Sequence, residues 1–337
     1  MIEKHRAALG ALALTAAALV AATPGFAEDE HTTLAIPGAT VGFITRYVAD
    51  DAGLWKQQGL DVKVLDIAGV GSMNAVISGS VDFSMSSGPS ITRAMAKGQH
   101  LVALATAINE SDEDIVIRKD IADAGHFDPG APLGVRGKLL KGHTFAVGGV
   151  AAIPDVVLKV VAIQAGLSRD DVVATPMQPP EYMAAFERKA IDGFVSGPPF
   201  IQQALVAGTG VVLSDSAKGE PTEYSPQSAG LLLTRADFCA GHRSICEKMV
   251  HGIVEAAKFV HEHRAETIAV AKKYFPTYSD AVLAQSIDML MAMTPSPPLT
   301  TPQMLENGDL INIAAGFLKE SDKLARYDDL IDNEFTK

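Results

Sequence analysis

The 337-residue sequence predicts an α/β protein of two similar lobes joined by two crossing segments, with a helical C-terminus. Strand and helix patterns alternate along most of the chain, which favours parallel strands connected by crossover helices. A phrase also recurs, as "VDFSMSSGPSI" at 81–91 and "IDGFVSGPPFI" at 191–201. The two Ser-Gly-Pro copies start 109 residues apart, which is too long for a solenoid repeat and fits two halves of one molecule.

The first half shows a regular succession of elements. Apolar alternation predicts strands, and apolar residues at helical spacing predict helices. The expected strands lie at 32–42 (ending in a glycine loop), 60–68, 81–87 and 100–107. The expected helices lie at 44–59, at 69–79 after a glycine loop, and at 89–98. We expect one lobe from this half.

The second half repeats the succession after a Gly- and Pro-rich connection at 125–142. Its expected strands lie at 143–149, 171–177 and 191–197, and its expected helices at 152–166, 179–190 and 198–208. Another strand follows within 225–238, and then helices at 242–264, 265–275 and 310–320. Because these helices bring no new strand pattern, we expect them to pack against the first lobe.

This succession predicts a discontinuous first lobe. We divide the chain into a leader at 1–27, the first part of lobe one at 30–115, lobe two at 116–226, and the second part of lobe one with the C-terminal helices at 227–337. The two crossing segments are expected near 110–118 and 226–234.

The N-terminus has the pattern of a secretory signal peptide. Lys4 and Arg6 precede an apolar run at 7–22, and Gly25 and Ala27 occupy the small-residue positions before a cleavage site. A membrane anchor is the alternative, but the run is short for a spanning helix. We expect cleavage after Ala27 and a soluble periplasmic product. No Cys is near the cut for a lipid anchor.

The composition excludes some partners. The chain is 47% hydrophobic with a formal charge of −12. An acidic protein is a poor partner for nucleic acids and anionic membranes, since both attract basic patches. No motif for a cofactor, a metal or a catalytic nucleophile stands out in the sequence.

The two cysteines, Cys239 and Cys246, allow two interpretations. A disulfide is plausible in an oxidising compartment if Cys239 lies in a loop before the helix that carries Cys246. The spacing Cys-x2-His-x3-Cys also resembles half of a zinc site, for which His251 is the nearby candidate for a fourth ligand.

The repeated turns predict a ligand site between the lobes. In open α/β sheets, loops at the carboxyl ends of strands line the ligand crevice, and both Ser-Gly-Pro turns occupy such ends. Glycine lets the backbone approach a ligand, and free N–H groups at helix starts favour an anion. The candidate ligand-binding residues are Gly42, Phe43, Ser72, Met73, Ser87, Gly88, Ala151, Ala152, Ser196 and Gly197, with Met177 and Phe194 as further apolar lining.

Several side chains leave alternatives open. Asp82 and Asp192 could form a catalytic pair of carboxylates, or each could fix its own turn, which the duplicated context favours. Arg46 could be the counter-ion of an anionic ligand, or it could face water one turn inside its helix. Phe43 could stack on a ligand or pack under its loop. Trp55 is expected between helix and sheet.

Ordered phrases along residues 35–275 resemble the substrate-binding proteins of ABC importers for aliphatic sulfonates, taurine, nitrate and thiamine-precursor pyrimidines. They are "RYVADDAGLWKQQGLDVKVL", "GSMNAVISGSVDFSMSS", "AMAKGQHLVALA", "LKGHTFAVGG" and "AAFERKAIDGFVSGPP". The resemblance implies a type 2 periplasmic binding fold that closes like a hinge on one small molecule. It also implies a monomer, with an inner-membrane permease and its ATPase as partners.

The chain departs from that family at three places. Phe43 stands where members often have a polar or ring side chain, Ala151 and Ala152 stand where they often have Ser or Thr, and Gly197 stands where they often have an acid. We therefore expect backbone N–H groups to meet a small organic anion such as a sulfonate, carboxylate or aromatic acid. Two alternatives remain: an enzyme or ligand-binding protein of the thiamine-pyrimidine type, and a sensory receptor for a membrane kinase.

Overall fold

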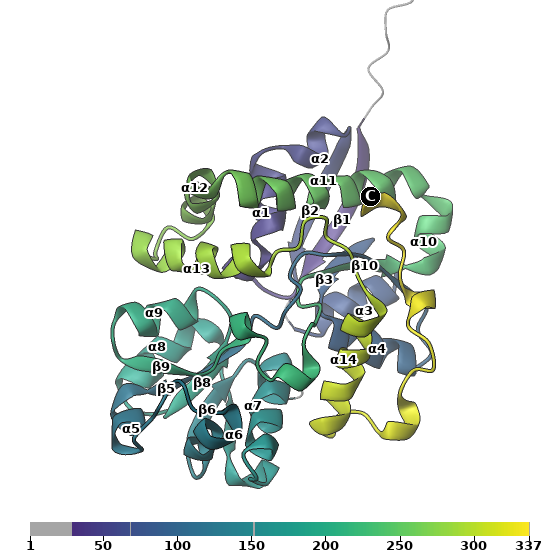
Figure 1. The fold of residues 1–337 in the computed structure, drawn as a ribbon. Helices are drawn as coiled ribbons and strands as arrows, with labels where there is room; N and C mark the ends of the chain where they lie inside the picture. Colours follow the sequence, from purple (N-terminus) through teal and green to yellow (C-terminus); the bar gives the residue numbers. More distant parts are fainter. Residues whose placement is uncertain (1–28, 68, 151, 337) are drawn as a thin grey trace, which may run out of the picture.

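The structure, a computed structural model, describes residues 29–67, 69–150 and 152–336 and contains two five-stranded sheets (Figure 1). The first sheet comprises β1 (Glu30–Ile36), β2 (Leu60–Asp66), β3 (Phe83–Ser86), β4 (Leu101–Thr106) and β10 (Leu231–Arg235). The second comprises β5 (Asp114–Arg118), β6 (Thr144–Val147), β7 (Val173–Pro176), β8 (Gly193–Ser196) and β9 (Gly210–Ser214). We call each sheet with its covering helices a body.

The two sheets have the same topology. Their strand orders are β2-β1-β3-β10-β4 and β7-β6-β8-β5-β9. The pairings β1–β2, β1–β3, β6–β7 and β6–β8 are parallel, as the sequence predicts. In contrast, β10 and β5 run antiparallel to both of their neighbours. Each of these strands directly follows a passage from one body to the other, so it enters its sheet from the opposite edge.

Short helices cover both sheets. In the first body these are α1 (Ile44–Asp51), α2 (Leu54–Gln57), α3 (Gly71–Ile77) and α4 (Gly88–Ala96). In the second they are α5 (Lys119–Ala124), α6 (Leu133–Arg136), α7 (Ile153–Gln164), α8 (Pro179–Glu187) and α9 (Phe200–Val206). Single 3-10 turns occur at η1 (Val41–Phe43), η2 (Gly137–Leu140), η3 (Arg169–Asp171), η4 (Ser216–Lys218), η5 (Thr222–Tyr224), η6 (Glu320–Asp322), η7 (Asp328–Leu330) and η8 (Glu334–Thr336).

The C-terminal helices contact both bodies. They are α10 (Ala236–Gly241), α11 (Arg243–Glu262), α12 (Arg264–Tyr274), α13 (Asp280–Met293) and α14 (Pro302–Ala314). Helices α11 and α12 pack on α1, as expected for the first body. However, α13 also packs on α9, and α14 contacts both α4 and α7 (Figure 1). The expectation that this region packs only against the first lobe is therefore wrong for α13 and α14.

The passages between the bodies are short. The chain leaves the first sheet at 107–113 and returns through 215–230. Residues 114–118 and 231–234, which the sequence placed in the crossing segments, are strand residues in the structure. Strand pairing therefore extends closer to the passages than the sequence suggested.

Asp82 and Asp192 play matching roles at the start of β3 and β8. The Asp82 carboxylate accepts a hydrogen bond from the backbone N–H of Thr33 at 2.9 Å, and the Asp192 carboxylate accepts one from the N–H of Thr144, also at 2.9 Å. Each bond ties one central strand to its parallel neighbour. The two carboxylates belong to different sheets and lie at the amino ends of their strands, so they do not form a catalytic pair.

The core of the first body lies between its sheet and α1, α2, α11 and α12. Trp55 is buried there, and its ring N–H donates to the carbonyl of Met249 at 3.1 Å. A Cβ on Gly252 would lie 2.1 Å from the Trp55 ring, so only glycine admits this close approach. The second body has clusters on both faces of its sheet, one under α7 and one under α8 and α9.

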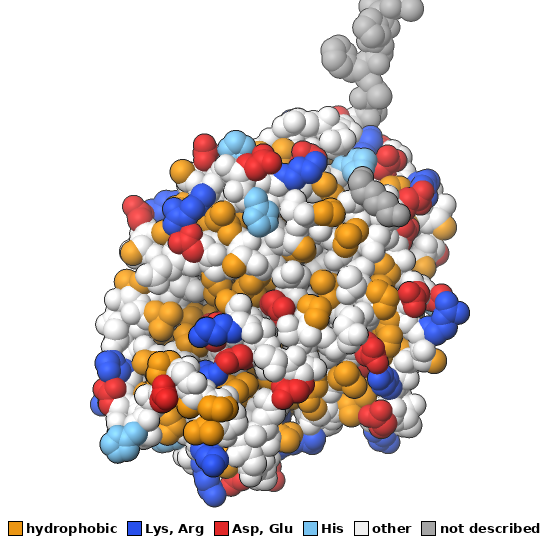
Figure 2. All heavy atoms as spheres, in the orientation of Figure 1, with side chains coloured by type: hydrophobic (Ala, Val, Ile, Leu, Met, Phe, Trp, Pro, Cys, Tyr) orange, Lys and Arg blue, Asp and Glu red, His pale blue; other side chains and the backbone are white. Residues whose placement is uncertain are grey.

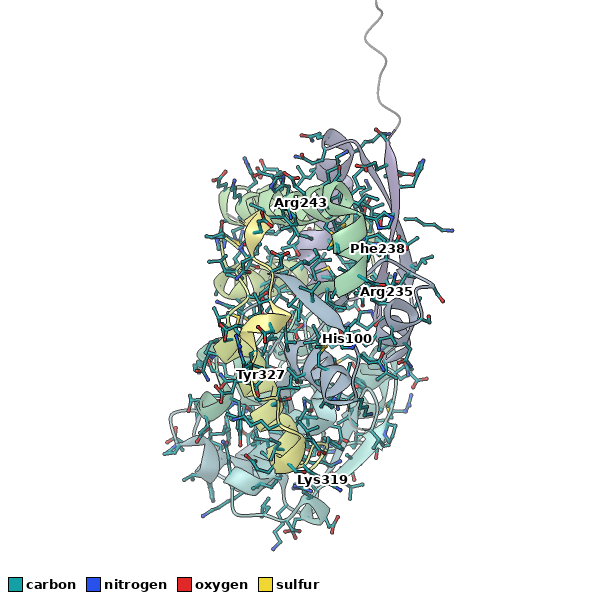
Figure 3. The ribbon with its side chains drawn as sticks, turned by 90° about the vertical axis from the view of Figure 1, so that its right-hand side faces the viewer. His100, Arg235, Phe238, Arg243, Lys319 and Tyr327 are labelled. Atoms are coloured by element: carbon teal, nitrogen blue, oxygen red, sulfur yellow. A yellow bond between two sulfur atoms is a disulfide. The ribbon has the colours of Figure 1, made fainter. Side chains whose placement is uncertain are left out.

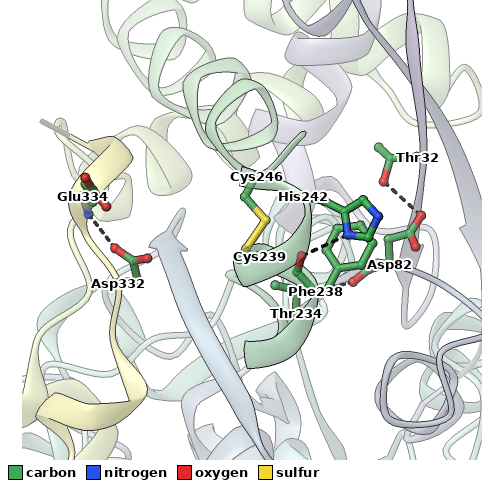
Figure 4. The surroundings of a disulfide bond; sticks show 9 residues. All are labelled: Thr32, Asp82, Thr234, Phe238, Cys239, His242, Cys246, Asp332 and Glu334. Atoms are coloured by element: carbon green, nitrogen blue, oxygen red, sulfur yellow. Dashed lines mark hydrogen bonds between the residues drawn. A yellow bond between two sulfur atoms is a disulfide. The ribbon is translucent and has the colours of Figure 1, made fainter. Parts of the chain in front are cut away.

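Cys239 and Cys246 form a disulfide with their Cα atoms 5.7 Å apart (Figure 4). Cys239 lies in α10, a short helix of its own, rather than in the loop that the sequence suggested. A non-helical residue, His242, separates α10 from α11 and lets the two cysteines approach. Because both sulfurs are in this bond, neither is available as a zinc ligand.

The signal peptide and its cleavage after Ala27 lie outside the described residues. Within the part of the chain that the structure describes, no helix combines the length and apolarity needed to cross a membrane. Acidic and basic side chains lie side by side over the face shown in Figure 2.

Candidate functional site

The carboxyl edges of the two sheets meet at Asp112, in the passage at 107–113. A Cβ on Gly42 would lie 2.6 Å from a carboxylate oxygen of Asp112, and one on Gly197 would lie 3.0 Å from the same atom. These two glycines come from different bodies and were both predicted to contact the ligand. They therefore share one acidic neighbour at the junction.

A direct hydrogen bond joins the bodies beside Asp112. The Thr40 hydroxyl donates to the carbonyl of Pro198 at 2.7 Å. The same hydroxyl oxygen accepts from the N–H of Gly42 at 3.2 Å and caps η1. The N–H of Gly42, which the sequence offered to an anion, therefore already has an internal acceptor.

The Ser-Gly-Pro turn of the first body is also internally bonded. The N–H of Gly88 donates to the carbonyl of Ser228 at 2.6 Å, and the hydroxyls of Ser87 and Ser90 lie 2.8 Å apart. Gly88 also lies against α14, with the Met304 carbonyl 3.5 Å from the position of a Cβ. This turn is thus covered by the second passage and by α14.

The recurrent phrase is one residue out of register with the structural repeat. In the parallel pairings, Leu34 is opposite Phe83 and Phe145 is opposite Gly193, so equivalent strand positions are 110 residues apart. Ser196 ends β8 just as Ser86, not Ser87, ends β3. Ser196 is buried and lies opposite Asp114 in the β5–β8 pairing.

The other predicted residues of the first body lie at the same edge but face inward. The Ser72 hydroxyl donates to the carbonyl of Gly69 at 3.1 Å. Met73 belongs to a buried apolar cluster under the sheet, and Phe43 belongs to the main core of this body. Contact of these three side chains with a ligand stays a prediction.

In the second body, Ala152 is half-buried at the N-terminus of α7, and Ala151 lies outside the described residues. Phe194 is fully buried in the cluster under α8 and α9, and Met177 packs against that cluster. Their role in ligand binding also stays a prediction.

Sequence reasoning missed three consecutive acids at this junction, Asp112, Glu113 and Asp114. Burial raises the pKa of Asp112 to about 6 and that of Asp114 to about 7, and it raises the pKa of Glu113 well above its usual value. The signal was visible as an acidic run beside apolar strand patterns, where carboxyl groups are rarely buried.

Asp114 has a structural partner, whereas Glu113 does not. One oxygen of Asp114 accepts from the N–H of Ser216 at 2.8 Å and from its hydroxyl at 2.5 Å. This pair ties the end of the first passage to the start of the second. In contrast, Oε2 of Glu113 is buried and has no hydrogen-bond partner among the described residues.

Tyr182 presents a second unpaired polar atom. Its side chain is fully buried in α8, and its hydroxyl has no hydrogen-bond partner among the described residues. The hydroxyl points at the loop after β6, since a Cβ on Gly148 would lie 3.9 Å from it. Burial raises the pKa of Tyr182, and the negative charge of Glu113 adds to this effect. The two residues are therefore electrostatically coupled.

A row of aromatic rings crosses between the bodies and ends at Tyr182. Its successive ring centroids are 5.2 Å apart for Tyr47 and Phe275, 6.4 Å for Phe275 and Tyr278, 6.2 Å for Tyr278 and Phe200, and 6.2 Å for Phe200 and Tyr182. The step from Tyr278 to Phe200 joins the first body to α9 of the second. Aromatic contacts of this kind stabilise an interface beyond the area they bury.

Arg46 does not face water. Its side chain is 9% exposed, and its guanidinium carbon lies 4.3 Å from the ring centroid of Tyr47 and 5.7 Å from that of Tyr274. The expectation of a solvated arginine is therefore wrong. A role as counter-ion to an anionic ligand stays a prediction.

A separate surface hollow lies at the other edge of the first sheet. It has a volume of about 500 Å³ and lies around His100 and Arg235 (Figure 3). His100 precedes β4 and Arg235 ends β10, so this hollow is at the amino end of β4, away from Asp112. It does not connect the two bodies.

Comparison with known families and curated proteins gives one family. The family model described as NMT1-like matches residues 2–274. Among curated proteins, the chain is 24% identical over 245 residues to a protein of Brucella abortus (strain 2308) whose name specifies a binding protein and no ligand. That match covers 69% of this chain and 70% of the relative.

Comparison with solved structures gives the fold. A protein of Bordetella bronchiseptica RB50 matches with a TM-score of 0.78 and 19% identity, covering 92% of this chain and 96% of the other. The alkanesulfonate-binding protein SsuA from Xanthomonas axonopodis pv. citri, bound to MOPS, matches with a TM-score of 0.70 and 16% identity, covering 91% and 99%. Most of the named neighbours are binding proteins of import systems, but one, DszB, was solved with biphenyl-2-sulfinic acid. The chain thus has the periplasmic binding protein fold.

Proposed function

Because the chain belongs to the NMT1-like family, we propose that it is the solute-binding receptor of an ABC importer. In this proposal the chain is exported to the periplasm and holds one small organic molecule between the carboxyl edges of its two sheets. The closed form then docks on an inner-membrane permease that is driven by its ATPase. No bond of the ligand is broken.

The observation that carries the proposal is the position of Asp112 between Gly42 and Gly197. It supports a ligand site at the junction, because two repeated edges converge there on one polar group. The two short passages can act as a hinge, and the contact of Phe200 with Tyr278 can form and break with closure. A ligand that binds the closed form better shifts the equilibrium toward it.

The ligand's charge is the open part of the proposal. The sequence favours a small organic anion, and the unpaired guanidinium nitrogens of Arg46 could serve one. Against an anion, the N–H groups of Gly42 and Gly88 are already bonded internally, and carboxyl groups lie at the junction itself.

The enzyme and kinase-sensor alternatives have weaker support. An enzyme that depends on free thiols does not fit this chain, since Cys239 and Cys246 are joined in a disulfide. No feature of the described residues favours delivery to a kinase over delivery to a permease.

The test is to express the full chain, purify it from the periplasm without denaturation, and record its native mass. We expect a co-purified small molecule whose removal lowers the melting temperature and increases the radius of gyration measured by X-ray scattering. If neither a co-purified molecule nor a broad panel of small amines, carboxylates, sulfonates and pyrimidines changes either quantity, the receptor function is wrong.

A further inference from the structure

We propose that the ligand presents a protonated amine or an amidine-like group to Glu113 and the hydroxyl of Tyr182, with Asp112 facing the same group. The inference rests on the proposed function, because it takes for granted that a small molecule binds between the bodies. It names the chemical class of that molecule: an organic cation or strong N–H donor with an apolar, ring-sized body.

The first argument is that two buried polar atoms at this place lack partners. Oε2 of Glu113 and the hydroxyl of Tyr182 are both buried without a hydrogen bond among the described residues. A buried polar group without a partner destabilises the structure that contains it, so such a pair calls for an explanation. Ligand N–H groups would supply the donors that both oxygens lack.

The second argument is the sign of the charge. Asp112, Glu113 and Asp114 follow one another in the passage, and Asp112 lies against glycines of both bodies. An anion placed there would meet like charges in a site of low dielectric constant, whereas a cation would compensate them. A protonated amine or amidine also matches the carboxylate geometry through charge-assisted hydrogen bonds.

The third argument excludes a metal ion as the cation. Among residues 29–67, 69–150 and 152–336, no three His, Cys, Asp or Glu side chains are arranged to hold a metal. Asp114 is also turned to Ser216 and serves the passages rather than a ligand. An organic cation needs only one or two of these oxygens and gains from the rings beside them.

The aromatic surroundings set the size of the ligand's body. Tyr182 stacks near Phe194 at a centroid distance of 5.4 Å and near Phe200 at 6.2 Å. A ligand group that reaches the Tyr182 hydroxyl would extend the interbody row of rings. Binding would thereby link the N–H contact to the closure contact between Phe200 and Tyr278.

The experiment uses matched probes on the full exported protein after removal of any co-purified molecule. Benzamidine and benzylamine are compared with benzoate, benzenesulfonate and benzyl alcohol by thermal shift and by titration calorimetry. We expect the two cations to raise the melting temperature and the two anions to leave it unchanged. A larger thermal shift with the anions than with the cations contradicts the inference.

Two conservative variants locate the contact. Glu113→Gln removes the negative charge, and Tyr182→Phe removes only the hydroxyl. We expect each to weaken benzamidine binding by about tenfold or more, the size of one lost buried hydrogen bond. Two matched changes at other places on the same body, Glu187→Gln and Tyr224→Phe, are expected to leave the affinity unchanged.

The outcomes separate the two proposals. If anions bind and close the protein while Glu113→Gln and Tyr182→Phe bind them as the parent does, the receptor function stands and this inference is wrong. If cations bind equally well to both variants, the inference is also wrong, since the contact lies elsewhere. If no probe or co-purified molecule binds at all, the receptor function itself fails.

Discussion

The two bodies share one framework but differ at the edges where they meet. Both have the same strand order, and Asp82 and Asp192 tie equivalent strands in the same way. At the carboxyl edge, the first body bonds its own polar groups, such as the N–H of Gly88. The second body leaves the Tyr182 hydroxyl unpaired. A duplicated fold has thus kept its frame and divided its tasks: the first body supplies a closing surface, and the second supplies polar contacts for a ligand.

The largest expected effect tests whether equivalent frame positions are interchangeable. Gly193 in β8 is equivalent to Phe83 in β3, but a Cβ on Gly193 would lie 2.4 Å from the Val116 carbonyl and 2.3 Å from the Phe145 ring. Gly193→Ala should therefore lower the free energy of unfolding by about 3 kcal/mol or more through overpacking. Urea unfolding measures it.

The matched control for Gly193→Ala is a space-conserving change on the first body. Phe83→Leu leaves an apolar side chain at the equivalent position and should cost less, about 1–2 kcal/mol. Equal losses for the two variants would contradict the asymmetry between the bodies.

The second prediction concerns pH and the junction acids. Burial raises the pKa of Asp112 to about 6 and of Asp114 to about 7, above the unfolded values, so the folded state binds these protons more tightly. Their contribution to stability is present near pH 4 and is lost as the pH rises through 6 and 7. The buried charges of Glu113 and Asp215 act in the same direction.

We therefore expect the ligand-free protein to lose on the order of 3 kcal/mol of unfolding free energy between pH 5 and pH 8. Denaturant titrations at each pH measure it. In the double variant Asp112→Asn, Asp114→Asn the slope should be largely removed. A stability that rises over this range would contradict the burial of these carboxyl groups.

Much of this contrast was accessible from the sequence, but not its most informative part. Strand and helix patterns predicted both lobes because local periodicity reports local structure. The duplication was visible in "VDFSMSSGPSI" and "IDGFVSGPPFI", although identical letters misled the alignment by one residue. The pairing of Gly42 with Asp112 could not be foreseen, because it depends on how two bodies meet.

The direction of β5 and β10 escaped for a related reason. Local patterns do not state from which edge a strand enters a sheet, and both strands follow a passage between bodies. The same holds for α14, whose Ile311 packs in the core of the second body while Gly308 packs on Pro89 of the first. Long-range packing, not propensity, decides these features.

The third prediction concerns the disulfide, a feature of the first body alone. It closes a short loop, so reduction should lower the unfolding free energy by about 2–3 kcal/mol in the chain-entropy model. The Cys239→Ser, Cys246→Ser variant should match the reduced parent in thermal unfolding. Because Cys246 packs in the first core, we expect no change in ligand affinity; a tenfold loss would contradict the separation of frame from site.

The smallest expected effect concerns the bond between the bodies. Thr40→Val removes the donor to the Pro198 carbonyl and should cost about 1 kcal/mol of closure, or about fivefold in ligand affinity. The variant Thr209→Val, at a surface turn within the second body, serves as the control. Calorimetry with the co-purified molecule measures both, and equal affinities would show that this bond does not contribute to closure.

The most direct test is the distance between α13 and α9. Spin labels at Gln285→Cys on α13 and Val206→Cys on α9 report whether these helices come together, and their exposed positions keep the labels clear of the core. Double electron–electron resonance should give a short, narrow distance distribution with ligand and a longer, broader one after its removal. An unchanged distribution would contradict the claim that the two bodies close on a ligand at Asp112.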